Sequence, residues 1–456
     1  MLLTVILAYV FSYLIPSKQK SVVNPIQSTQ AFFIARSGVE FAVRYAKDQG
    51  WTTKAQLAGL TGMTRNFGAG RFILTYTDTA PNLDTLTSVG EVPIGTVRRS
   101  VRISNFTSFL YYFAYHKSIT VQAGQVSNGP LTNFPMLVSV TNPNLATVVN
   151  GGHVASYNAG TNDPWDIIFE AQDDTTCGGS GTSPCKLNHE IEAYNPMTGQ
   201  LVAWVRVPSI NNGTVIYMYY GNSCMTSSTQ NASGVWADYR GVWHSGESGT
   251  TLSDSTSNNN LSTNSTQTTG QIGNAQSYNG TWQLASKTTG VVNIPANNAN
   301  QTISVWFTIG VADNNVRSGV SFVNPTSGSG VQFGKRSSAP AGVVGFWQWG
   351  GVLLGGTQTS PTAGTWHYMV YTFNGTTHRP YFDGTALTSA WTPAAQTGVP
   401  TRIYFSTYDG TNERWNGRID EVRITNTVRS TGWILTEYRN QNAPGTFYTV
   451  GAEQNN

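Results

Sequence analysis

The chain consists of an apolar N-terminal run, a helical stretch and a long polar remainder. Residues Met1–Ile15, MLLTVILAYVFSYLI, contain no charged side chain, and Pro16 ends this run before two lysines. A second proline stands at Pro25, and the stretch Gln27–Trp51 is predicted to be a helix. The remainder is rich in Thr, Ser, Asn and Gly and alternates between apolar and polar positions, which predicts β-structure.

Three strand-like runs follow the predicted helix. They are Gly70–Thr77 (GRFILTYT), Leu83–Val92 (LDTLTSVGEV) and Gly95–Ser104 (GTVRRSVRIS), and turn residues separate them. This pattern predicts a small antiparallel sheet beside the helix. Residues 105–108 are predicted to be a linker.

Regularly spaced short strands fill the rest of the chain. The runs YFAYHKSITVQ, LTNFPMLVSV, DIIFEAQ, KLNHEIEAYN, GQLVAWVRVP and VIYMYYGN predict a β-sandwich over residues 110–235. From residue 236 onwards, Ile303–Ile309, Thr365–Leu387 and Trp415–Gln441 are predicted as strands of a second sandwich. The Asn-Gly and Asp-Gly pairs in this second part are typical of hairpin turns.

The composition fits an exported β-protein. Only 11% of the 456 residues are charged, against roughly 25% in ordinary soluble domains. The net charge of +3 is too small and too dispersed to indicate a nucleic-acid partner. Cys177 and Cys185 enclose a Gly/Ser/Pro-rich loop, which predicts a disulfide formed in an oxidising compartment, with two free thiols as the alternative.

The apolar run at the N-terminus fits neither a signal peptide nor an ordinary membrane span. It lacks a basic region before the apolar residues and a small-residue cleavage site after them. As a helix, fifteen residues rise about 22 Å, whereas the hydrocarbon core is roughly 30 Å thick. A helix that is apolar on every side must be buried. We therefore predict two successive environments for it, first lipid and then other copies of itself.

This opening run resembles the mature N-terminus of type IV pilin-like proteins, particularly minor pilins and pseudopilins. The segment ARSGVEFAVRYA, residues 35–46, resembles the part of those proteins where the stalk helix enters the head. The resemblance implies a mature chain that starts at Met1 after leader cleavage, and a stalk helix loosened at its prolines. It also implies assembly contacts from Met1, Leu2, Leu3, Val5, Ile6, Leu7, Tyr9, Val10, Phe11, Leu14, Ile15, Pro16 and Pro25.

One position departs from the pilin pattern. Most major pilins carry a glutamate at the fifth mature position, where this chain has Val5. Some pseudopilins of filament tips also lack that glutamate, so the place of this subunit, along the shaft or at the tip, stays open.

The two later regions resemble extracellular domains. The order WDIIFEA, LNHEIEAYNPMTGQLVAWVRVP, YMYYGN resembles an extracellular domain of unknown function found in bacteria and archaea, which precedes lectin-like jelly rolls. The strand GRIDEVRI followed by RSTGWI resembles laminin-G-like, concanavalin-A-like jelly rolls. Many relatives of that fold hold Ca²⁺, which implies Glu247, Asp254 and Asp420 as candidate ligands. The alternative for Asp420 is a carboxylate turned to backbone donors beside Arg423.

Two further sets of side chains are candidates for chemistry. In HEIE, Glu190 and Glu192 point to one face of a strand, about 7 Å apart. They are either a glycosidase-like acid/base pair or a solvated strand face. Trp347 and Trp349 are either sugar-stacking aromatics or core residues. The chain has no HExxH, GxSxG or phosphate-binding loop.

The predicted fold class is α+β, with a long pilin-like N-terminal helix and small antiparallel sheet followed by two mainly-β sandwiches. The predicted parts are a stalk helix over 1–50, a head over 51–105, a β-sandwich of unknown function over 110–235 and a laminin-G-like jelly roll over 236–456.

The predicted function is that of a structural subunit of an extracellular type IV pilus-like filament, anchored in the membrane before assembly. Its partners would be its own copies, other pilins, the inner membrane before assembly and surface glycans, but no nucleic acid. The alternatives are a tip adhesin with a lectin-like head and, third, an anchored carbohydrate-active enzyme. No catalytic residues are predicted, and Ca²⁺ is the one cofactor considered.

Overall fold

The computed structural model of the chain describes residues 15–455 with some gaps. The residues outside the description within that span are 50, 52–53, 80–82, 95, 105, 107–112, 180, 182, 224, 226, 312–314, 337–342, 351, 358–359 and 388–395. The chain forms two compact units, Met1–Tyr112 and Phe113–Asn456.

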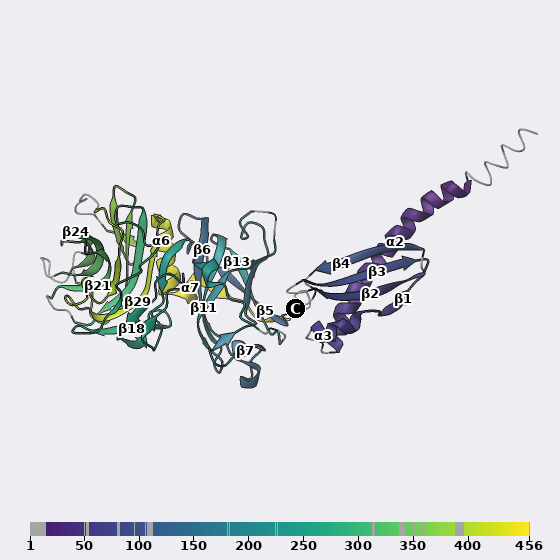
Figure 1. The fold of residues 1–456 in the computed structure, drawn as a ribbon, viewed down its shortest axis with the longest axis horizontal. Coiled ribbons are helices and arrows are strands. Elements are labelled where there is room, and N and C mark those ends of the chain that lie inside the picture. Colours follow the sequence, from purple (N-terminus) through teal and green to yellow (C-terminus); the bar gives the residue numbers. More distant parts are fainter. Residues whose placement is uncertain are drawn as a thin grey trace, which may run out of the picture. The chain divides into compact units, whose positions relative to one another are not determined.

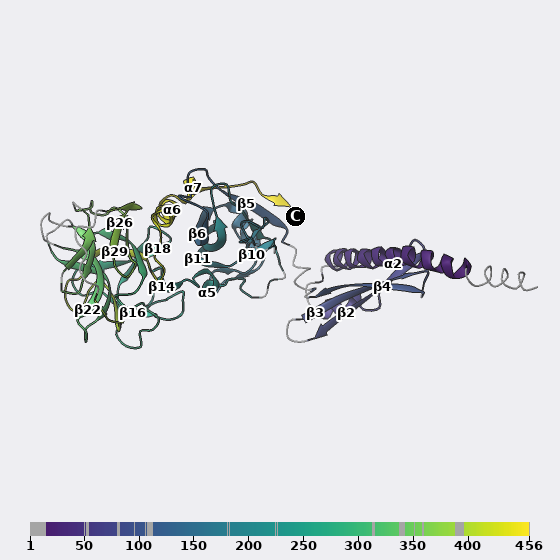
Figure 2. The same ribbon diagram turned by 90° about the horizontal axis from the view of Figure 1, so that it is seen from above.

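The first unit is one helix packed on one antiparallel sheet. Helix α2 (Ile15–Asp48) lies along a sheet of order β1-β2-β3-β4, as Figure 2 shows. The bounds are β1 Thr64–Phe67, β2 Gly70–Thr79, β3 Leu83–Val92 and β4 Val97–Ser104, with α3 (Lys54–Leu57) and the 3₁₀ turn η2 (Ala58–Leu60) between α2 and β1. The three strands predicted from the sequence are confirmed within two residues at each end.

Small residues let α2 approach the sheet closely. Ala31, Ala35, Ala42 and Ala46 recur at helical spacing and are fully buried. On the sheet side, a Cβ at Gly90 would clash with the backbone of α2. Larger side chains of both elements, among them Ile34, Val39, Phe72, Leu74 and Leu86, fill the core beside this contact. Each such apolar side chain contributes about 1.5–3 kcal/mol on burial.

The second unit begins with a β-sandwich. One of its sheets has the order β10-β9-β13-β5-β30, with β31 also paired to β5, and the other has the order β11-β12-β6. The bounds are β5 Tyr115–Val121, β6 Leu131–Thr141, β9 Ile168–Ala171, β10 Cys185–Leu187, β11 His189–Asn195, β12 Gln200–Ile210, β13 Val215–Tyr220, β30 Tyr448–Val450 and β31 Gln454–Asn455. A small hairpin, β7 (Tyr157–Asn158) with β8 (Asp163–Pro164), and short helix α5 (Ala232–Val235) complete it.

The last strands of the chain therefore belong to the first sandwich. β30 pairs antiparallel with β5, so the C-terminal segment returns to the strand that opens this unit. Its side chains Phe447 and Tyr448 lie in the core of the first sandwich together with Phe134 and Ile119.

The jelly roll consists of two larger sheets around the largest core. One has the order β17-β18-β29-β20-β25-β26-β27, with β14 also paired to β29, and the other the order β15-β16-β19-β28-β21-β22-β23-β24. The bounds of the first are β14 Tyr239–Trp243, β17 Thr266–Thr269, β18 Asn274–Asn279, β20 Gln301–Ile309, β25 His367–Phe373, β26 His378–Phe382, β27 Thr385–Ala386 and β29 Asn416–Thr425. Those of the second are β15 Thr251–Leu252, β16 Leu261–Thr263, β19 Ala285–Lys287, β21 Arg317–Asn324, β22 Ser329–Lys335, β23 Val344–Gln348, β24 Val352–Gly356 and β28 Arg402–Phe405.

Helix α6 joins the two sandwiches. Figure 1 shows α6 (Thr431–Asn442) and α7 (Pro444–Phe447), in yellow, between them. The side chain of Asn440 forms two hydrogen bonds with the backbone of Leu137 in β6, at 2.7 and 3.0 Å. On the other side, the Tyr368 hydroxyl in β25 donates to Glu437 of the same helix at 2.8 Å. The helix is therefore hydrogen-bonded to both sheets.

The structure corrects the predicted fold class. Strand accounts for 45% and helix for 14% of the protein, so the α+β prediction is wrong and the protein is mainly β. Within the described residues the predicted long pilin-like helix over 1–50 is not found: the N-terminal helix α2 begins at Ile15 and is a small part of a mainly-β protein. The β-sandwich and jelly-roll predictions fit the structure.

The segment after β29 is also corrected. Trp415–Gln441 is predicted as strands throughout, but its second half is the helix α6. Ser430 caps this helix, because its hydroxyl oxygen accepts from the backbone N–H of Trp433 at 3.2 Å. The capping serine marks the start of a helix that the apparent alternation of apolar positions conceals.

None of the described helices has both the length and the apolar character needed to cross a membrane.

The place of the C-terminal segment yields a first prediction. Phe447 is fully buried in the first sandwich, so Phe447→Ala should lower the unfolding free energy of the second unit by about 3–5 kcal/mol. The measurement is the urea midpoint of the full chain followed by tryptophan fluorescence. Gln454→Ala, at an exposed position of β31, is the control and should leave the midpoint unchanged. A loss below about 1 kcal/mol for Phe447→Ala would contradict the placement.

Candidate functional site

The two sandwiches meet at a buried interface with its own apolar core. Leu137 and Trp204 from the first sandwich pack there against Trp236, Val242 and Ile272. Acidic side chains lie beside this core and come from both sides. Strand β11 contributes Glu190 and Glu192, and strand β29 contributes Asp420 and Glu421.

Glu190 and Glu192 are not a solvated strand face. Their side chains are only 15% and 5% exposed, so that interpretation of HEIE is wrong. A β-bulge after Ile191 shifts the register of β11 against β12. The indole N–H of Trp204 donates to Glu192 at 2.9 Å, and the indole N–H of Trp236 donates to Glu190.

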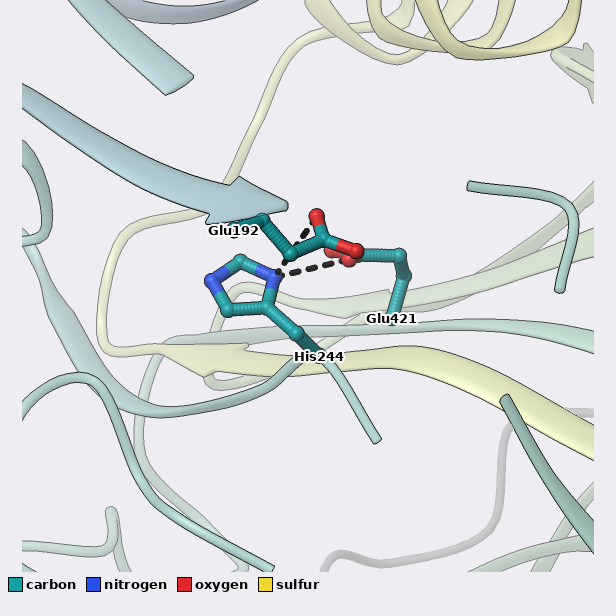
Figure 3. A group of neighbouring side chains, drawn as sticks. All are labelled: Glu192, His244 and Glu421. Carbon is teal, nitrogen blue, oxygen red and sulfur yellow. Dashed lines mark hydrogen bonds and ion pairs between the residues drawn. The ribbon is translucent and has the colours of Figure 1, made fainter. Parts of the chain in front are cut away.

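His244, which follows β14, lies between carboxylates of both sandwiches. Its Nδ1 is 2.7 Å from Glu421 Oε1 and 3.6 Å from Glu192 Oε2, and its Nε2 is 3.2 Å from Glu190 Oε2. Figure 3 shows the first two carboxylates converging on Nδ1. Burial alone favours the neutral ring, but Glu421 and Glu190 raise the pKa of His244 well above its usual value.

Arg423 supplies a second buried positive charge. It is 1% exposed and forms ion pairs with Glu421 and with Glu437 of α6, the latter at 3.1 Å. Its guanidinium lies 4.0 Å from the Trp204 ring centroid and 4.7 Å from that of Trp236. These contacts combine charge pairing with cation–π attraction.

The acids in the interface outnumber the bases, and their pKa values diverge. Burial, followed by the charge of Glu421, raises the pKa of Glu192 to about 8. Burial and the same neighbour raise the pKa of Asp420 well above its usual value. Burial also opposes ionisation of Glu421, yet His244 and Arg423 hold its pKa below the ordinary value. The cluster therefore retains protons on some of its carboxyl groups at neutral pH.

A tight turn between β17 and β18 covers the cluster. The backbone N–H groups of Gln271 and Ile272 donate to Asp420 Oδ2 at 2.9 and 3.0 Å, as the alternative for Asp420 predicts. Gly273 in this turn has φ +49°, and a Cβ there would lie 2.6 Å from Glu192 Oε1. Glycine is therefore required for the turn to approach the carboxylate.

A cavity of about 230 Å³ borders these residues. Glu190, Glu192 and His244 line one part of it, and Glu247 and Ser255 line another. The Ser255 hydroxyl donates to Glu190 Oε1 at 2.7 Å. The arrangement can share protons among carboxylates, and it can neutralise a bound cation.

The three predicted calcium ligands accept hydrogen bonds from different backbone groups. Both carboxylate oxygens of Asp254 accept backbone N–H groups, from Val242 at 2.9 Å and from Asn259 at 2.8 Å. Glu247 Oε1 accepts from the Ser253 N–H at 2.6 Å. Within the described part of the chain, the residues gathered at metal-ligand distances are Glu192, His244 and Glu421 instead. The calcium site stays a prediction.

The other predicted residues are placed as follows. Cys177 and Cys185 form a disulfide with an S–S distance of 2.09 Å. Trp347 is 3% exposed beneath Arg336, and Trp349 packs edge-on against Tyr408.

Most of the predicted assembly residues precede α2, and three lie within it. Residues 1–14 lie outside the described residues. Ile15, Pro16 and Pro25 lie within α2, which continues through Pro25.

Two known families match parts of the second unit. The profile of the concanavalin A-like lectin/glucanases superfamily matches residues 285–435. The profile of a domain of unknown function, DUF2341, matches residues 180–265. The second unit therefore contains a concanavalin-A-like jelly roll and a β-sandwich domain of unknown function, which confirms both resemblances. No curated protein matches the chain significantly.

Solved structures similar to the chain include glycosidases and toxin binding domains. Domain 4 of AbnA, a GH43 extracellular arabinanase from Geobacillus stearothermophilus, is 14% identical with a TM-score of 0.36, covering 44% of this chain and 98% of that one. Trypanosoma rangeli sialidase is 9% identical with a TM-score of 0.36, covering 83% and 62%. The receptor binding domain of the botulinum neurotoxin C/D mosaic serotype is 13% identical with a TM-score of 0.34, covering 45% and 52%. At these TM-scores the likenesses carry no argument about activity.

His244 and Glu421 are the members of the cluster that the sequence analysis missed. A signal for Glu421 exists, because GRIDEVRI carries four charged residues among the apolar positions of a strand. Such residues in a buried strand need partners. His244 has no comparable signal, since a single histidine after a strand is uninformative until the fold brings β11 to it.

The raised pKa of Glu192 predicts how stability depends on pH. Because the folded pKa of about 8 lies above the reference value of 4.5, the contribution of Glu192 to stability is complete below pH 4.5 and is lost as pH rises through 8. Glu192→Gln removes this loss. With a metal chelator in the buffer, the Glu192→Gln variant should have a Tm about 5 °C above that of the wild-type chain at pH 9, and the same Tm at pH 4.5.

The control for this profile is Glu413→Gln, which alters a carboxylate paired with Arg336 elsewhere in the jelly roll. It should not reproduce the increase in Tm at pH 9. Equal Tm values for Glu192→Gln and wild type at pH 9 would contradict the prediction, because they would show that ionisation of Glu192 does not lower the stability of the folded protein.

Proposed function

We propose that this chain is a subunit of an extracellular filament of the type IV pilus kind, which assembles through its N-terminal helix and displays its β-domains outside. The observation that carries this proposal is an uncovered apolar stripe on α2. While one face of the helix packs on the sheet, Ile26, Phe32 and Phe33 on the other side are 57%, 45% and 57% exposed. Exposed large apolar residues gathered in one place mark an interaction surface.

The apolar stripe ends at Phe33. One turn beyond Phe33, the exposed positions carry Arg36 and Glu40, which form an ion pair at 3.8 Å. Towards the N-terminus, the sequence instead leads back to the uncharged run Met1–Ile15. Lys18 and Lys20 stand between the two, so the stripe and the uncharged run are separate apolar segments of the sequence.

Helices of other copies of this chain are the occupant that fits this stripe. At roughly 25 cal/mol per Å² of apolar surface, burial of the stripe and the run before it would dominate the association free energy. A head-to-tail contact that does not close on itself produces an open filament. Before assembly, the same run would anchor the subunit in the inner membrane, and other pilins would be alternative neighbours.

The rest of the chain is suited to display in an oxidising, extracellular setting. It has few charges, one disulfide within the first sandwich, and a rigid connection of two sandwiches through α6. The major or minor place of the subunit depends on the contacts of Val5 in the filament.

Phe33→Glu tests the proposed assembly surface. Because Phe33 contributes to no described core, the variant should fold and accumulate normally, but its incorporation into filaments should fall at least about tenfold when a charge enters the buried contact. The measurement is the amount of the chain in filaments sheared from producing cells, by immunoblot and electron microscopy.

The matched control is Phe67→Glu, which alters a phenylalanine of similar exposure, 56%, in β1. It should leave incorporation unchanged. Normal incorporation of Phe33→Glu, or filaments of normal abundance and structure without this chain, would refute a structural role.

Adhesion to surface glycans is a second candidate function. The superfamily matched by residues 285–435 is named for lectins as well as glucanases. A specific observation in its favour is Trp282, which is 58% exposed on a turn whose N–H groups donate to Asn279 Oδ1. An exposed aromatic ring on a rigid turn offers a flat apolar surface with one polar edge. Trp347 is too buried for this role.

Glycan-array binding tests adhesion. We expect the full chain to bind a subset of the glycans on the array. Trp282→Ala should lose most of that binding. Its Tm should not change, because the Trp282 ring contacts solvent. Wild-type protein that retains no glycan with Ca²⁺ present would exclude the lectin-like role.

A further inference from the structure

Three potential metal ligands converge at the contact between the sandwiches. A carboxylate oxygen of Glu192, Nδ1 of His244 and a carboxylate oxygen of Glu421 lie within 4.8 Å of one another. Glu192 comes from the first sandwich, and the other two come from the jelly-roll side (Figure 3). Bonds to a shared ion would therefore connect two separately formed sheets.

A second observation points to a ligand at this place. Within the described residues, Glu192 Oε1 has no hydrogen-bond partner, although the side chain is only 5% exposed. Asp420 Oδ1, which is also buried, lacks a partner in the same part of the structure. Buried carboxylate oxygens are rarely left without a donor or a cation.

The surroundings hold the three ligands in position. Glu190 Oε2 faces His244 Nε2 at 3.2 Å, so when an ion displaces the proton on Nδ1, the ring keeps its N–H on the Glu190 side and binds the ion through Nδ1. Arg423 holds the other oxygen of Glu421, and the Trp204 indole holds Glu192. A carboxylate behind a ligating histidine is the usual outer contact of protein metal sites.

The donor set favours a transition metal over calcium. One imidazole nitrogen and two carboxylates, with an open side for water, suit Zn²⁺ or Mn²⁺. Ca²⁺ requires six to eight oxygen ligands, which these residues do not offer. The partly open cavity of about 230 Å³ beside Glu192 and His244 supplies an entry path and room for water.

We infer that Glu192, His244 and Glu421 form a binding site for a divalent transition-metal ion that links the β-sandwich to the jelly roll. The ion would add metal–ligand bonds between the two sheets to the apolar contact of Trp204 and Trp236. This site is independent of the assembly surface on α2, so either inference can fail alone.

The test is zinc binding by the purified full chain. The protein is stripped with a chelator, the chelator is removed, and Zn²⁺ is titrated by isothermal calorimetry at neutral pH. We expect one ion per chain, and at a hundredfold excess over the Kd an increase in Tm of about 4 °C. Ca²⁺ at the same concentration should give neither effect. Co²⁺ in place of Zn²⁺ should show the visible absorption of a nitrogen-ligated ion.

Three variants assign the site. Glu192→Gln removes one ligand but keeps an acceptor for Trp204, and should weaken zinc binding at least about tenfold. Glu190→Gln keeps all three ligands and should weaken binding about 10- to 100-fold. Glu413→Gln, a carboxylate outside the cluster, is the control and should bind as wild type does.

Two results would overturn the inference. One is the absence of zinc binding and of any Tm increase in the wild-type chain, which would leave His244 as an ion-pair partner only. The other is wild-type affinity in both Glu192→Gln and Glu190→Gln, which would locate the ion elsewhere. Incorporation of these variants into filaments, measured separately, should remain normal.

Discussion

The structure of the second unit depends on the burial of Arg423. This guanidinium is 1% exposed, lies against Trp204 and Trp236, and pairs with Glu421 and Glu437. Loss of the charge would leave Glu437 without a cation and Glu421 with His244 as its remaining cation, at a cost of about 3–5 kcal/mol. Because the partners of Arg423 come from β29, from α6 and from the sandwich that carries Trp204, the pairing fixes the position of the two β-domains relative to each other.

The course of the chain reinforces this coupling. After completing the jelly roll with β29, the chain forms α6 across both sheets and returns as β30 to pair with β5. The first sandwich therefore lacks an edge partner and two core side chains until the last residues are in place. The jelly roll is likewise covered on one sheet by α6, where Ile434 packs against Trp306 and Tyr368. Each domain is therefore completed by the segment that follows β29. The acidic cluster around His244 lies at the contact between the two domains.

The sequence predicts the strands well and their long-range relations poorly. Alternation and turn residues locate β2, β3 and β20 within about two residues, because these signals are local. α6 is missed because its apolar positions resemble alternation until the cap at Ser430 is weighed. The fold class is wrong because the conspicuous N-terminal helix is a small part of a mainly-β chain. At the site, HEIE and GRIDEVRI contain the acids, but nothing local shows that β11 and β29 face each other across His244. Burial, which decides between a solvated face and an ion cluster, is a tertiary property.

The central claim is that the two β-domains form one cooperative unit held by the buried charges. Native-state hydrogen exchange of the full chain tests it, by comparing amides of β12 in the first sandwich with amides of β20 in the jelly roll. The account predicts one common opening free energy for both strands, and an equal decrease in both when Arg423 is replaced in Arg423→Met. Different opening free energies in the wild type, or a decrease confined to β20, would contradict it.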